Sequence, residues 1–83
     1  MLPAENNFEI ARKLITEEFG ELPEGVRSAL TAYIDASELY HSSPKAKNYE
    51  TFWSAQQILE QFCAINVDCR TAHSRVSEAM HAN

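Results

Sequence analysis

The side chains best suited to reactive chemistry in this sequence are two cysteines and a histidine close together, Cys63, Cys69 and His73. Because residues four apart share one face of a helix, Cys69 and His73 could bind one zinc ion, with Cys63 across a preceding turn. Zinc takes about four ligands, and the fourth would have to be His41, His81 or a distant acid. It is simpler to expect that both cysteines pack as small buried hydrophobic residues, because this requires no further ligand. A disulfide would require the chain to turn between them. We therefore expect no metal and no other cofactor.

The sequence lacks the common catalytic motifs. Its two glycines, Gly20 and Gly25, do not form a phosphate-binding loop, since neither precedes a Lys-Ser or Lys-Thr pair. The patterns His-Glu-x-x-His, Gly-x-Ser-x-Gly and paired Cys-x-x-Cys do not occur. Glu17 and Glu18 are adjacent, so on a helix their carboxylates point about 100° apart and do not meet at one substrate. The sequence therefore predicts a protein that is not an enzyme.

Negative charge is concentrated in the first half of the chain. Residues 1–44 hold three Lys or Arg and eight Asp or Glu, whereas residues 45–83 hold four of each, so the first half carries the whole net charge of −5. The densest stretch, here called the acidic corner, consists of Glu17, Glu18, Glu21 and Glu24. An anionic surface repels phosphates and anionic lipids and attracts basic proteins. We expect a protein partner with a basic surface, no membrane binding and little affinity for nucleic acid, although a solvated acidic face that aids solubility explains the charge more simply.

Three aromatic residues lie near the edges of the apolar stripes and are here called the aromatic edge: Tyr40, Tyr49 and Trp53. A bundle of this size cannot cover every aromatic side chain, and Tyr and Trp anchor many protein interfaces. Trp53 could instead close the rim of the bundle with its indole N–H in water. With the acidic corner, the aromatic edge favours a non-enzymatic protein-binding module. It would be a regulator or inhibitor that occludes a partner protein, as small acidic helical proteins of phages and plasmids often do.

The last predicted helix offers an alternative function. Its polar residues could contact phosphates and bases, which would make the protein a small dimeric DNA-binding transcriptional regulator. The candidate nucleic-acid-binding residues are Arg70, His73, Ser74 and Arg75. Only the two arginines carry a full positive charge. A helix-turn-helix motif needs a small residue in its first helix and an apolar residue in its second. With Ala64 as the small residue, the polar Ser74 would occupy the apolar position. A homodimer is compatible with either function.

Four helices must position these groups. Apolar residues recur at helical spacing, and no stretch alternates cleanly with period two. Glycine, proline and turn residues interrupt the pattern three times and predict helices near residues 6–19, 24–41, 45–64 and 68–81. Because the connections are short, we expect a single domain over residues 1–83, an all-α compact bundle of three to four short antiparallel helices.

Individual residues are expected to bound these helices and fill the core. Asn6 should cap the first helix and Asp68 the last, and Gly20 should adopt the left-handed conformation that ends many helices. The third apolar stripe, which is the strongest, should bury Phe52, Ala55, Leu59, Phe62 and Cys63.

The sequence also bears on the compartment of the protein. No apolar run approaches the roughly 18 residues of a membrane span, and the first residues lack the basic flank and apolar core of a secretory signal. Two cysteines alone fit a reducing compartment better than a disulfide-stapled secreted domain. We therefore expect a cytoplasmic protein.

Overall fold

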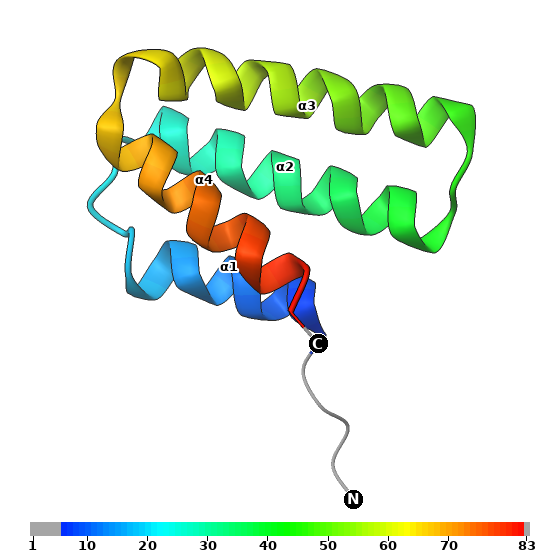
Figure 1. Ribbon diagram of the computed structural model, residues 1–83, viewed down its shortest axis with the longest axis horizontal. Helices are drawn as coiled ribbons and strands as arrows, with labels where there is room; N and C mark the ends of the chain where they lie inside the picture. The colour runs from blue at the N-terminus through cyan, green and yellow to red at the C-terminus, as the bar shows by residue number, and fades with distance from the viewer. Residues whose placement is uncertain (1–5, 83) are drawn as a thin grey trace, which may run out of the picture.

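Four helices make up the protein in the computed structural model, which describes residues 6–82 (Figure 1). The helices are α1 (Asn7–Glu17), α2 (Glu24–Ser42), α3 (Ala46–Ile65) and α4 (Val67–Met80). The described residues contain no strand, so the predicted all-α class is confirmed. The largest difference from the predicted bounds is at the end of α1, which stops two residues early. None of the four helices is both long enough and apolar enough to cross a membrane.

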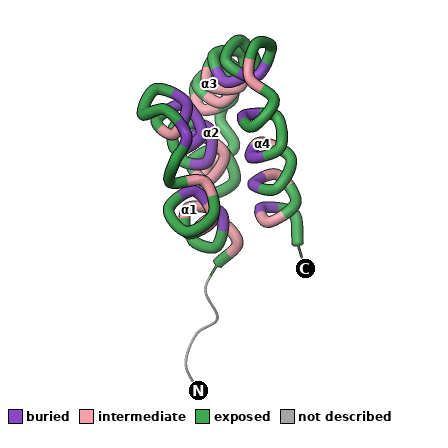
Figure 2. The backbone as a smooth tube through the Cα atoms, turned by 90° about the vertical axis from the view of Figure 1, so that its left-hand side faces the viewer, coloured by how far each residue is buried: buried purple, intermediate pink, exposed green. Residues whose placement is uncertain are grey.

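The helices run alternately in opposite directions (Figure 1). α2 lies between α1 and α3, which do not contact each other, and α4 packs against all three from one side (Figure 2). As a consequence, the α1–α2 and α3–α4 connections meet at one end of the bundle. The α2–α3 connection lies at the opposite end, toward which α1 begins and α4 finishes (Figure 1).

The core is one continuous cluster of apolar side chains. Its buried members are Ala11, Ile15, Leu22, Val26, Ala29, Leu30, Tyr33, Ile34, Leu59, Cys63, Cys69, Ala72, Val76 and Met80. α2 contributes more of them than any other helix because three helices cover it, whereas α3 lies at the margin of the bundle and buries only Leu59 and Cys63. Each fully buried aliphatic side chain contributes roughly 1.5–3 kcal/mol, which is why these short helices are stable together and not alone.

The predicted core of the third helix is only partly correct, because Leu59 and Cys63 are buried whereas Phe52 and Ala55 are half-buried. Phe62 was expected inside, but its side chain is 36% exposed. Its ring lies against the first turn of α2, within 3.6 Å of where a Cβ on Gly25 would stand. Ile34, for which no prediction was made, is fully buried because α2 is covered by α1 as well as by α3 and α4.

The helix ends follow the predictions only in part. The Asn6 side chain accepts a hydrogen bond from the Glu9 N–H at 2.9 Å, which confirms that cap. The prediction for the last helix is wrong, because Asn66 caps α4 by accepting from the Cys69 N–H at 3.0 Å, and Asp68 lies inside the first turn. Gly20 does not adopt a left-handed conformation. It is needed instead for close approach, since a Cβ there would stand 2.9 Å from the carbonyl oxygen of Thr16.

A charge cluster fastens α1 to α2. The Arg12 guanidinium donates to Glu9 at 2.7 Å, to Asp35 at 2.8 and 3.0 Å and to Glu38 at 2.5 Å. The hydrogen bond to Glu38 is the largest cause of a pKa of Arg12 above its ordinary value. Three of the carboxylates in the first half of the chain therefore share one arginine on the surface between α1 and α2, and they do not belong to the acidic corner.

Candidate functional site

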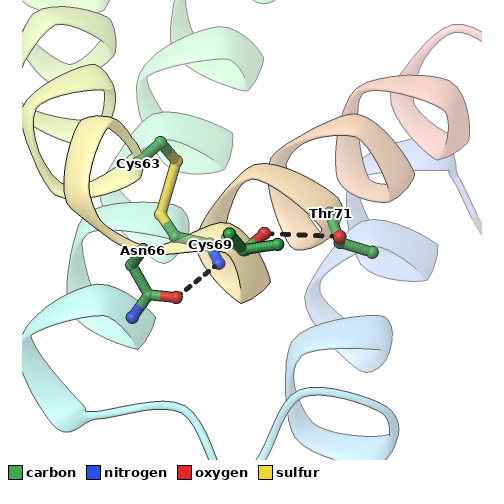
Figure 3. Close-up of a disulfide and its surroundings, with 5 residues drawn as sticks. Cys63, Asn66, Cys69 and Thr71 are labelled. Carbon is green, nitrogen blue, oxygen red and sulfur yellow. Dashed lines mark hydrogen bonds between the residues drawn. A yellow bond between two sulfur atoms is a disulfide. The ribbon is translucent and has the colours of Figure 1, made fainter.

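The two cysteines form a disulfide that joins the end of α3 to the first turn of α4 (Figure 3). The Cα atoms of Cys63 and Cys69 are 4.9 Å apart, and both side chains are buried. The Asn66 cap makes the turn that brings them together (Figure 3). Neither sulfur is a thiolate that could hold zinc in this state, and residues 6–82 contain no group of three or more metal-ligating side chains.

His73 lies beside this turn but faces a different neighbour. Its ring meets the Tyr33 ring edge-on, with the centroids 5.1 Å apart. Burial lowers the pKa of His73 below its ordinary value, and the negative charge of Glu60 offsets this only in part. At neutral pH the imidazole is therefore uncharged, which suits a packing role better than a contact with phosphate.

The acidic corner is exposed at the end of the bundle where the α1–α2 and α3–α4 connections meet. Glu17, Glu18 and Glu21 line a hollow of about 640 Å³ whose other side is formed by the α3–α4 turn, including Asp68. Glu24 stands next to it, at the start of α2. Glu18 pairs with Arg75, whereas Glu17, Glu21 and Glu24 form no ion pair with a described residue. The hollow is therefore a site of uncompensated negative charge.

Exposed apolar side chains border the same turn. Ile65, the last residue of α3, is 89% exposed, and Val67, the first residue of α4, is 64% exposed. They flank Asn66, which lines the acidic hollow. Neither residue was among the predicted partner-binding residues. The sequence signal for their exposure was a pair of β-branched residues, one on each side of the capping Asn66, at a connection between two helices.

The aromatic edge lies at the other end of the bundle. The rings of Tyr40, near the end of α2, and Tyr49, in the first turn of α3, are 5.5 Å apart. Trp53 follows Tyr49 by one helical turn and is 49% exposed. From Glu24 to Tyr40 is about 24 Å along α2, at about 1.5 Å per residue. The acidic corner and the aromatic edge are thus two separate surfaces and not one.

The residues of the alternative nucleic-acid site are spread around α4. Arg75 donates to Glu18 at 3.0 Å and so faces α1. His73 packs against α2 through Tyr33, while Arg70 and Ser74 are exposed. The four side chains therefore do not form one basic surface.

Comparison of the chain with models of protein families, with curated proteins and with solved structures finds no match.

Proposed function

We propose that this protein is a small non-enzymatic binding module, a regulator or inhibitor that occludes the surface of a basic partner protein. The observation that carries the proposal is the acidic hollow with exposed apolar residues at its border. Three glutamates that form no ion pair within residues 6–82, namely Glu17, Glu21 and Glu24, stand near Ile65 and Val67. Charge of this kind accelerates encounter with a basic surface, and desolvated apolar side chains slow release.

The exposure of Ile65 is the stronger half of this argument. A solvated acidic face alone would aid solubility and need no partner. A large aliphatic side chain left almost wholly in water gains roughly 1.5–3 kcal/mol when it is covered, and the bundle itself has no element that could cover it. A second chain that brings Lys or Arg to the hollow and an apolar surface to the turn would satisfy both requirements.

The alternative, a dimeric DNA-binding regulator, receives less support. Of the two α4 arginines, Arg75 is paired with Glu18, and His73 is uncharged at neutral pH. A phosphate contact through Arg75 would have to break an ion pair beside the acidic corner. DNA binding depends on such contacts for most of its affinity.

The compartment and the assembly are parts of the proposal. In the cytoplasm, as we propose, Cys63 and Cys69 would be reduced much of the time, and both would stay buried as small apolar side chains. An inhibitor of the phage or plasmid type would act as one chain on one partner. If a homodimer forms through the aromatic edge, the acidic corner stays free at the opposite end.

Capture from a lysate of the source cells tests the proposal. The immobilised protein should retain a basic protein in stoichiometric amount, and the variant Glu17→Gln/Glu21→Gln should lose it. The control Glu50→Gln/Glu78→Gln makes the same change in net charge on exposed residues elsewhere and should keep it. Equal loss in both variants would show that only net charge matters, and capture of no stoichiometric protein would contradict the proposal.

A further inference from the structure

A cleft of about 770 Å³ opens at the end of the bundle away from the acidic corner. It lies among the start of α1, the second half of α2, the start of α3 and the end of α4. Four aromatic rings line it, those of Phe8, Tyr33, Tyr40 and Phe52. Sites for small ligands typically occupy about 300–1,000 Å³ and combine apolar walls with a few polar groups, so the cleft has the size of a binding site.

The rings in the cleft are already arranged for stacking. The Tyr40 and Phe52 centroids are 6.3 Å apart with the rings only 19° from parallel, and the Tyr33 centroid lies 5.6 Å from that of Phe52. Phe8 comes from α1 and packs at 5.7 Å from His41. Aromatic rings at these separations attract one another beyond the effect of their buried area. A planar ligand would therefore meet aromatic surfaces from three helices.

The Tyr33 hydroxyl has no hydrogen-bond partner among the described residues. Its side chain is only 6% exposed, yet the structure gives its hydroxyl no hydrogen bond to any residue in 6–82. Every side-chain N or O atom in this range that is sealed from solvent does have a partner, so the Tyr33 hydroxyl is reached from outside. Tyr33 is one of the residues that line this cleft, so a ligand bound there would lie beside it.

The lining also selects the charge of the ligand. Among the described residues that line it there is no Asp, Glu, Lys or Arg, and the polar members are neutral amides, a serine, tyrosine hydroxyls and two histidines. An ion in the cleft would lose hydration without gaining a counter-charge, which is strongly unfavourable. The cleft therefore favours an uncharged ligand.

We propose that this cleft binds an uncharged aromatic small molecule. Its ring stacks among Phe8, Tyr40 and Phe52, and its polar atom forms a hydrogen bond with the Tyr33 hydroxyl. The site does not involve the acidic corner, so a failure of this proposal would not contradict the proposed function, and the reverse also holds.

The test uses 2-naphthol as the probe, followed by chemical-shift titration of the full chain. We expect saturable shifts at cleft residues such as Ser37 and Phe52, with a Kd of about 0.1–1 mM for a ligand of this size. The anion 2-naphthoate should bind at least about tenfold more weakly, because the lining offers no counter-charge. Cyclohexanol, which keeps the hydroxyl but has no aromatic ring, should bind more weakly as well.

A matched pair of variants isolates the hydrogen bond. Tyr33→Phe keeps the packing and should weaken 2-naphthol binding by about 3- to 10-fold, the effect of one buried hydrogen bond. Tyr49→Phe removes a hydroxyl outside the cleft and should leave binding unchanged. No saturable binding, shifts centred on Trp53, or equal affinity of Tyr33→Phe and the unmodified protein would overturn the proposal. Concentration-dependent shifts in the cleft without any probe would also overturn it, since a second copy would then be the occupant.

Discussion

The guanidinium of Arg75 lies 3.0 Å from the carboxylate of Glu18, so α4 is tied to the residue that follows α1. Both side chains are close to half exposed. This ion pair joins a residue of the candidate nucleic-acid site to a residue of the acidic corner, and each neutralises the other. Within the described part of the chain, the acidic corner keeps three glutamates without an ion pair, and α4 keeps only Arg70 without one.

The first prediction concerns DNA. Because one free arginine makes few phosphate contacts, any affinity for duplex DNA should be weak, and its logarithm should fall with the logarithm of salt with a slope of about −1 to −2. Gel-shift or anisotropy titration at several salt concentrations measures both quantities. A steep slope that Arg70→Ala and Arg75→Ala both reduce would support the DNA-binding alternative instead.

The second prediction concerns pH and His73. Burial disfavours the imidazolium in the folded protein, so the unfolded chain binds the proton more readily below pH 6.5. The contribution of the neutral His73 imidazole to the free energy of unfolding is therefore fully present above pH 6.5. It is lost as the pH falls from 6.5 toward the pKa of His73 in the folded state, which is lower. NMR titration should place the His73 midpoint below 6.5. The variant His73→Gln should lose less stability than the unmodified protein between pH 7 and pH 5, and identical losses would contradict this explanation.

The third prediction concerns the disulfide. Closing so short a loop removes chain entropy worth about 2 kcal/mol from the unfolded state, so reduction should lower the Tm by about 10 °C without unfolding the protein at room temperature. Thermal melting followed by circular dichroism, with and without reductant, measures the shift. The double variant Cys63→Ala/Cys69→Ala should not respond to reductant. A Tm of the unmodified protein that is unaffected by reductant would show that the bridge adds no stability.

The fourth prediction concerns the charge cluster on α1 and α2. The side chain of Arg12 is 26% exposed and bonds three carboxylates, so Arg12→Gln should cost about 1 kcal/mol at low salt. The cost should shrink in 1 M salt, where the Debye length is about 3 Å. Lys47→Gln, which removes a charge from an exposed position on α3, is the control and should have little effect. Equal costs at low and high salt would mean that packing and not charge explains the loss.

Much of the fold could be predicted from the sequence because local rules decide it. Four helices and nearly all of their bounds were predicted from the helical spacing, from the Asn6 cap and from the turn residues that interrupt the pattern. The residues that were misplaced or left without a prediction are those whose surroundings depend on tertiary packing. Ile34 is buried because α2 is the central helix, and Phe62 is partly exposed because α3 is at the margin; neither position can be seen in a single helical stripe.

The candidate site was less predictable for the same reason. Exposure of the acidic corner follows from its charge, but its neighbours are set by which helix ends meet. Strict alternation of four antiparallel helices implies that the first and third connections share an end, which would have brought Glu21 near Ile65 and separated both from Tyr49. The disulfide required a turn at Asn66, and that turn depends on a cap three residues before Cys69.

The association rate constant with the captured partner, measured as a function of salt, tests the central claim most directly. We expect it to fall as salt is raised, and we expect Glu17→Gln/Glu21→Gln to lower it several-fold at low salt while Glu50→Gln/Glu78→Gln leaves it unchanged. Ile65→Ser should speed dissociation and leave association unaltered. An association rate constant that changes neither with salt nor in the Glu17→Gln/Glu21→Gln variant would contradict the account.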